Sequence, residues 1–184
     1  MVIALIGLAA LAGSIPFGLL IARARGVDIR RTGSGNIGAT NVTRALGARI
    51  GALVLLLDAA KGAVPVALAM RAGCPATFIA TVGGAAILGH CFSPWLRFAG
   101  GKGVATALGV FVVLSWPATL LAVAVFALTV AITRVPAIGS LVAVAAIAVT
   151  FAVRGPGAYA VFAALVVALL VFTHRTNLAA LRRT

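Results

Sequence analysis

Residues 136–153 read PAIGSLVAVAAIAVTFAV, an eighteen-residue run without a charged side chain. As a helix, a run of this length and apolarity crosses the hydrocarbon core of a bilayer. Six further apolar runs accompany it, with approximate bounds 3–22, 50–70, 76–96, 104–116, 118–133 and 157–173. The sequence therefore predicts one all-α domain over residues 1–184, a polytopic membrane bundle of seven transmembrane helices.

The composition agrees with a membrane protein and excludes other classes. Of the 184 residues, 63% are hydrophobic and 9% are charged, whereas a soluble domain is about half apolar and a quarter charged. The chain has too little polar surface for a soluble globule and too much apolar surface for a disordered segment. Its apolar runs are also too continuous for the alternating strands of an outer-membrane barrel.

The basic residues predict the orientation of the bundle, since Lys and Arg collect in cytoplasmic loops. Fifteen Lys and Arg stand against two Asp and no Glu. With seven spans, twelve of the fifteen fall in loops on one side, Arg71 and Arg154 fall on the other, and Lys61 lies within the second span. We therefore expect the N-terminus outside and the C-terminus in the cytoplasm. If 104–133 is instead one re-entrant hairpin, the same end of the protein stays basic.

The first donor-rich loop, residues 31–44, reads RTGSGNIGATNVTR. Gly33, Gly35 and Gly38 match the dinucleotide pattern G-x-G-x-x-G, but no buried strand or βαβ unit surrounds them, so that fold is excluded. Glycines still let backbone N–H groups approach an anion closely. The other donors and cations here are Ser34, Asn36, Thr40, Asn41, Arg31 and Arg44. The loop indicates an anion site, with a plain flexible connection as the alternative.

The second donor-rich loop, residues 89–106, reads GHCFSPWLRFAGGKGVAT. Its GGKG turn resembles a nucleotide-binding P-loop only faintly. Leu96 stands where the first Walker glycine belongs, and Gly103 replaces the Ser or Thr that would hold Mg²⁺. A glycine-rich turn with Lys102 at a helix N-terminus nevertheless suits a phosphate group.

Two polar groups within or near the spans have open roles. Asp58 and Lys61 are three residues apart on one helix face, and charges inside a membrane are costly and therefore paired or functional. His90, at the inner end of the third span, fits either a bracing or a catalytic role. Ser140, His174 and Asn177 add hydroxyl, imidazole and amide groups at the same membrane level.

The cysteines and acidic residues offer no metal site. Cys74 and Cys91 match no ligand or redox spacing, and no set of His, Asp and Cys has ligand spacing. We therefore expect no metal and no other cofactor. The basic side chains crowd one membrane face rather than a soluble surface, which favours anionic substrates at the membrane over nucleic acid.

These strings resemble the bacterial acyl-phosphate:glycerol-3-phosphate acyltransferase family over nearly the whole chain. GSGNIGATNVTR (33–44) is similar to the family's first motif, LDAAKG (57–62) to its second-span signature, and residues 89–106 to its second motif. TRVPAIGS (133–140) lacks the Tyr-Val-Ser-Leu stretch usual after the Arg. HRTNLAALRR (174–183) ends without the common Gly-Thr-Glu.

The resemblance implies an enzyme of the bacterial cytoplasmic (inner) membrane with its active site on the cytoplasmic face. It would move an acyl group from acyl phosphate to the 1-hydroxyl of sn-glycerol 3-phosphate, giving lysophosphatidic acid and phosphate, the first acylation of phospholipid biosynthesis. Its partners would be these two substrates and membrane lipids, with no nucleic acid, and a monomer is expected. By resemblance the catalytic residues are Ser34, Lys102, His174 and Asn177, and the phosphate-binding residues are these four with Asn36, Arg44, His90, Gly101, Gly103 and Ser140.

The attacking hydroxyl must lose a proton, and the sequence offers few bases. Asp28 and Asp58 are the only side-chain carboxylates. A substrate phosphate, with a second pKa of about 6, is the favoured acceptor, and His90 and His174 are the alternatives. Two other functions compete: an anion transporter or channel, which needs polar residues through several spans, and a structural subunit, which needs no donor-rich glycine loops.

Overall fold

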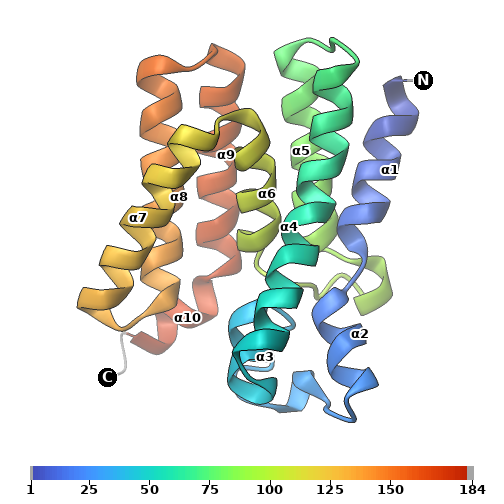
Figure 1. The fold of residues 1–184 in the computed structure, drawn as a ribbon, viewed down its shortest axis with the longest axis vertical. Helices are drawn as coiled ribbons and strands as arrows, with labels where there is room; N and C mark the ends of the chain where they lie inside the picture. The colour runs from blue at the N-terminus through green and yellow to red at the C-terminus, as the bar shows by residue number, and fades with distance from the viewer. Residues whose placement is uncertain (1, 182–184) are drawn as a thin grey trace.

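The computed structural model describes residues 2–181, and within them every regular element is a helix (Figure 1). Arg182 and Arg183, which the orientation argument counted, lie outside the described residues. In chain order the elements are α1 (Val2–Ser14), α2 (Phe17–Ala24), the 3-10 turn η1 (Ile29–Arg31), α3 (Ala39–Leu46), α4 (Ala48–Arg71), α5 (Ala76–Cys91), the 3-10 turn η2 (Pro94–Leu96), α6 (Val104–Leu114), α7 (Trp116–Thr133), α8 (Pro136–Arg154), α9 (Gly157–Thr173) and α10 (Arg175–Leu181).

All seven predicted apolar runs fold as helices. Among the described residues, five stretches are long and apolar enough to cross a membrane, and the α9–α10 pair, bent by 57°, makes a sixth. The remaining apolar helix, α6, has 11 residues. Length and composition therefore give five or six membrane-spanning helices, with α6 as the short member of the bundle.

The helices run up and down, and the polar connections gather at one end. The segments that follow α2, α5, α7 and α9 lie in the lower half of Figure 1, and the turns after α4, α6 and α8 lie toward the opposite end. The loops that contain Ser34, Lys102 and His174 therefore share one end of the molecule, as the sequence predicts.

Three local features differ from the predicted runs. The first run, expected to be continuous over 3–22, breaks after Ser14 because Pro16 has no N–H to continue the helix. The runs 104–116 and 118–133 are separated at Ser115 rather than at residue 117, and the Ser115 Oγ accepts a hydrogen bond from Ala118 N at 3.4 Å and caps α7. Residues 23–49, which separate the first two predicted runs, contain η1 and the eight-residue α3.

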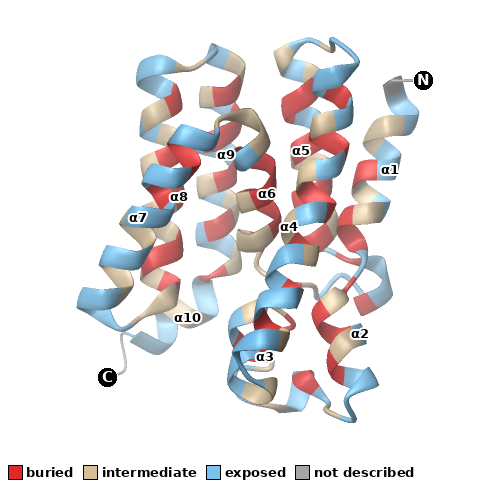
Figure 2. Cartoon of the chain, viewed as in Figure 1, coloured by how far each residue is buried: buried red, intermediate tan, exposed pale blue. Residues whose placement is uncertain are grey.

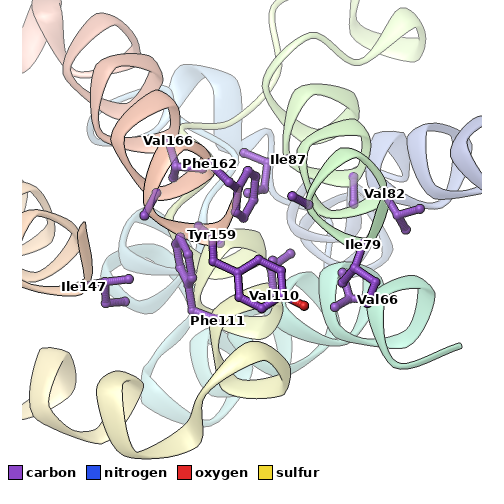
Figure 3. Close-up of a cluster of buried hydrophobic side chains, with 14 of the residues drawn as sticks. Val66, Ile79, Val82, Ile87, Val110, Phe111, Ile147, Tyr159, Phe162 and Val166 are labelled. Atoms are coloured by element: carbon purple, nitrogen blue, oxygen red, sulfur yellow. The ribbon is translucent and has the colours of Figure 1, made fainter. Parts of the chain in front are cut away.

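The main core fills the space between α4, α5, α6, α8 and α9 (Figure 3). The Phe111 ring centroid lies 6.0 Å from that of Phe151 and 5.6 Å from that of Phe162. Glycines let the helices approach closely: a Cβ at Gly13 would lie 2.1 Å from Ala86 O, and one at Gly109 would lie 1.9 Å from Ala59 O. Small residues at such crossings are typical of helix packing in membranes.

A second, smaller core lies at the same end of the molecule as the polar loops. It consists of Leu19, Ala22, Ile29, Ile37, Val42, Val54 and Leu96. These side chains join α2, α3 and the start of α4, which form the lower part of the molecule where buried and exposed positions alternate (Figure 2). The first donor-rich loop is therefore anchored by its own apolar residues.

Candidate active site

Asn41 holds the first donor-rich loop in shape. Its side-chain Nδ2 donates to Ile29 O at 3.2 Å, to Thr32 O at 2.9 Å and to Asn36 O at 2.9 Å, while its Oδ1 accepts from Ser34 N at 3.0 Å. Asn41 is buried. The expectation that its amide faces an anion is wrong, because these four bonds use both ends of the side chain inside the loop.

The other candidate residues of this loop remain at the surface. Ser34, Thr40 and Arg44 are exposed, and Arg44 lies in the last turn of α3. Asn36 is half-buried, and its Oδ1 accepts from Gly38 N at 2.8 Å. The loop therefore presents one guanidinium and a set of hydroxyl groups on a frame that Asn41 fixes.

The second loop folds back onto the end of α5. Gly100 N donates to Cys91 O at 3.0 Å and Gly101 N to His90 O at 3.1 Å. These bonds satisfy two of the carbonyls that a helix C-terminus leaves without partners. The expectation that the Gly101 N–H faces a phosphate is therefore not met, and the N–H groups of Lys102, Gly103 and the first turn of α6 are the ones left for an anion.

Two glycines of this turn have specific structural reasons. A Cβ at Gly101 would lie 2.1 Å from His90 Nε2, so the turn and the imidazole are in direct contact. Gly103, the N-cap of α6, has a φ of 88°, a left-handed conformation that favours glycine. Between them, Lys102 is half-buried, and its side chain extends from the turn toward α10.

The last residue of α9, Thr173, and Asn177 of α10 each contact the Lys102 segment. Lys102 Nζ donates to Asn177 Oδ1, and Thr173 Oγ1 is 3.0 Å from Lys102 O and 3.1 Å from Leu170 O, so its single proton is shared between the two carbonyls. Sequence reasoning missed Thr173, although a hydroxyl next to the predicted His174 was a usable signal. Residues 71 to 75 positions apart are thereby brought together.

The site is electropositive because its cations lack acidic partners. Burial lowers the pKa of Lys102 from its ordinary value, and the nearby charge of Arg44 lowers it further. The chain's two acidic side chains are engaged elsewhere: Asp28 lies 3.4 Å from Arg31, and Asp58 lies 2.7 Å from Lys61. Lys102 and Arg44 therefore form a positive centre suited to an anion.

His174 has a defined tautomer when it is neutral. Its Nδ1 lies 2.8 Å from Leu170 O, and since a carbonyl oxygen only accepts, Nδ1 carries the proton. Burial lowers the pKa of His174, the bond to Leu170 opposes this, and the charge of Lys102 lowers it further. The neutral ring therefore has its lone pair on Nε2.

The remaining candidates have distinct surroundings. Ser140 is buried in the first turn of α8 and its hydroxyl donates to Pro136 O at 2.9 Å. His90 is buried behind Gly101, with its Nδ1 3.8 Å from Asp58 Oδ1. In residues 2–181 no three His, Cys, Asp or Glu side chains gather as metal ligands.

Comparison with known proteins agrees with this arrangement. A family model described as glycerol-3-phosphate acyltransferase matches residues 3–184. The chain belongs to the glycerol-3-phosphate acyltransferase family. A family protein of Myxococcus xanthus is 53% identical over 98% of this chain and 95% of its own length. One from Geotalea daltonii is 49% identical over 94% of this chain and 89% of its own length.

Solved structures of the acyltransferase family share the fold as well. The crystal structure of PlsY (YgiH), an integral membrane glycerol 3-phosphate acyltransferase, in its glycerol 3-phosphate form has a TM-score of 0.95 and 38% identity, covering 99% of this chain and 92% of that one. Its lysophosphatidic acid form has a TM-score of 0.93. This family member is accordingly a multi-pass membrane protein.

Proposed function

We propose that this acyltransferase-family protein moves a fatty acyl group from acyl phosphate to the 1-hydroxyl of sn-glycerol 3-phosphate, yielding lysophosphatidic acid and inorganic phosphate. The observation that supports it most is the hydrogen bond between Lys102 and Asn177, beside the charge of Arg44 and the imidazole of His174. Both substrates bear phosphate, and this cluster offers cations and neutral donors without an acidic competitor.

The proposed reaction needs little activation of its leaving group. The hydroxyl oxygen of glycerol 3-phosphate attacks the acyl carbonyl, and the bond from that carbon to phosphate breaks. Lys102, Arg44 and the first N–H groups of α6 stabilise the negative charge on the phosphate that departs. Ser34, Asn36, Gly103, Ser140, His174 and Asn177 complete the proposed contacts with the two substrates.

We assign the hydroxyl proton to a substrate phosphate, whose second pKa of about 6 suits this role. Asp58 is buried and paired with Lys61, and Asp28 caps η1 and lies near Arg31, so neither is placed as a base. Nε2 of His174 is the alternative acceptor. His174→Gln distinguishes the two. If a substrate phosphate accepts the proton, the pH profile of the variant stays unshifted. If His174 is the base, the variant loses the acid limb of the profile.

The proposed setting is the bacterial inner membrane, with seven crossings, the N-terminus outside, the C-terminus and the site in the cytoplasm, and a monomer as the working unit. The support is the gathering of Arg23, Arg44, Arg97 and Lys102 in segments at one end of the bundle. Topology reporters fused to both termini test it. Reporters on the same side of the membrane would contradict seven crossings.

The decisive experiment measures phosphate release by the purified protein in detergent, supplied with acyl phosphate and glycerol 3-phosphate. We expect release that requires both substrates and persists in EDTA, since protein cations hold the phosphates. Acyl-CoA in place of acyl phosphate tests the donor. Absence of release, with uptake of phosphate by proteoliposomes, would support the transporter instead, and Lys102→Ala serves as the control with reduced activity.

A further inference from the structure

Helices α1 and α2 are separated by a short break (Figure 1). Two backbone carbonyls at this break accept hydrogen bonds from side chains that are distant in the sequence. The helix stops at Ser14, and Pro16 has no N–H to donate. Ser93 Oγ donates to Ser14 O at 2.7 Å, and Lys61 Nζ donates to Ile15 O at 2.7 Å. Two distant elements, the loop before the GGKG turn and helix α4, therefore cap the same break.

Lys61 is fixed at this break from several sides. Its Nζ lies 2.7 Å from Asp58 Oδ1 and 5.6 Å from the centre of the Phe17 ring, the first residue of α2. Its side chain is 3% exposed and that of Asp58 is 2% exposed. The ammonium thus joins the Ile15 carbonyl of the break, the first ring of α2 and a buried carboxylate of α4.

The same carboxylate leads to the GGKG turn. His90 Nδ1 lies 3.8 Å from Asp58 Oδ1, the other edge of the ring contacts Gly101, and His90 O accepts the Gly101 N–H. Lys102 follows directly. A set of buried contacts therefore runs from the break in the first span to the residue that we place on phosphate. Hydrogen bonds join its two ends, and the link between Asp58 and His90 is a close approach that is too long for a hydrogen bond.

Helix α2 in turn sets the position of the first donor-rich loop. A Cβ at Gly18 would lie 1.8 Å from Ile37 O, so helix and loop are in backbone contact. Leu19 and Ala22 share the second core with Ile37 and Val42. A change in the direction of α2 would consequently move the loop that contains Ser34 and Arg44.

We propose that Lys61, Asp58, His90 and Ser93 form a positioning unit, which holds the loop of Ser34 and Arg44 at a fixed separation from the turn of Lys102. The inference rests on the proposed function, because it assigns both loops to the binding of phosphate-bearing substrates. The unit lies behind the site and acts through Lys102 and the α2-supported loop rather than on substrate.

The test is a double-mutant cycle with Lys102→Ala. The main variant combines Asp58→Asn with Lys61→Met, which leaves no unpaired buried charge, and the second is Ser93→Ala, which removes a single hydroxyl. Thr119→Val is the matched control, because Thr119 is equally buried but caps the distant α6–α7 turn. For each protein, alone and with Lys102→Ala, one measures KM for glycerol 3-phosphate, kcat and the unfolding midpoint in detergent.

We expect the main variant and Ser93→Ala to raise KM by about 10- to 100-fold, more than they lower kcat, because misplacement by about 1 Å has effects of this size. In the Lys102→Ala background, the same substitutions should change the logarithm of KM by less than half as much. Thr119→Val should lower the unfolding midpoint and leave KM unchanged.

Two results would overturn the inference: an unchanged KM in folded variants, or an equal fold-change in both backgrounds, which indicates a purely structural role. If the main variant does not fold, Ser93→Ala alone decides. Turnover by the parental protein reports separately on the proposed function, so failure of the inference and failure of that function give different results.

Discussion

The chain has two lysines, and their surroundings are opposite. Lys61 is enclosed in α4 next to a carboxylate, and its ammonium also donates to the Ile15 carbonyl in the break between α1 and α2. Lys102 is half-buried in a glycine turn, with a neutral amide as its partner and a second cation, Arg44, nearby. One lysine has its charge balanced within the protein, and the other does not.

This difference distinguishes a lysine with a structural role from a lysine that is suited to bind substrate. A balanced buried pair fixes helices relative to one another, and breaking it leaves an isolated charge. An unbalanced cation at a helix N-terminus is costly until an anion binds. The side chains around each lysine, rather than its depth in the membrane, therefore indicate which one meets substrate.

The largest expected effect is on stability at Lys61. Lys61→Ala leaves Asp58 buried without its cation and leaves Ile15 O with only the Phe17 N–H as its donor, so unfolding should become easier by about 3–5 kcal/mol. Unfolding in detergent measures this loss. Adding Asp58→Asn to Lys61→Ala should recover part of it, and a double variant no more stable than the single one would contradict the balanced-pair interpretation.

The next largest effect is on catalysis at Lys102. Lys102→Ala should lower kcat/KM by about 30- to 1000-fold, equivalent to about 2–4 kcal/mol, because a charge-assisted contact is lost in a partly dry site. The unfolding midpoint should stay near the parental value, since Lys102 lies in a turn rather than the core. Near-parental rates at subsaturating glycerol 3-phosphate would show that this turn does not hold phosphate.

Much of this contrast is predictable from the sequence. Charge-free apolar runs locate the helices, and the spacing of Asp58 and Lys61 predicts their pair on one helix face. The anion site that the GGKG string indicates stays a prediction. These inferences depend on neighbours along the chain, where periodicity and spacing are informative.

The remaining features depend on contacts between distant segments. The partner of Lys61 at Ile15 is 46 positions away, and Thr173 reaches Lys102 O across 71 positions. Asn41 was expected to bind an anion because its residue type allows this, but the fold directs its amide to three carbonyls of its own loop. Residue type predicts that an amide will bond, while packing decides with which group.

A pH dependence of moderate size should distinguish the two lysines further. Burial, reinforced by Arg44, lowers the pKa of Lys102, so the free protein gains stability as pH rises through that pKa while its phosphate binding weakens. KM for glycerol 3-phosphate should rise with pH, by up to about tenfold per unit, starting below the ordinary range of lysine. Lys102→Arg keeps its charge, and a rise in KM that persists unchanged in that variant would assign the effect to another group.

The smallest expected effect concerns the hydroxyl that fixes the Lys102 segment to α9. Thr173→Val keeps the shape of the side chain but removes the bond to Lys102 O, while Leu170 O retains its bond from the His174 N–H. Loss of one such bond weakens a contact by about 0.5–1.5 kcal/mol, so KM for glycerol 3-phosphate should rise about 2- to 10-fold. Thr173→Ser should behave like the parental protein.

Thr129→Val is the matched control, because the Thr129 hydroxyl bonds only Val125 O of its own helix. This variant should leave KM unchanged. If Thr173→Val and Thr129→Val give the same KM, the position of Lys102 is set by Gly101, His90 and Asn177 without help from Thr173.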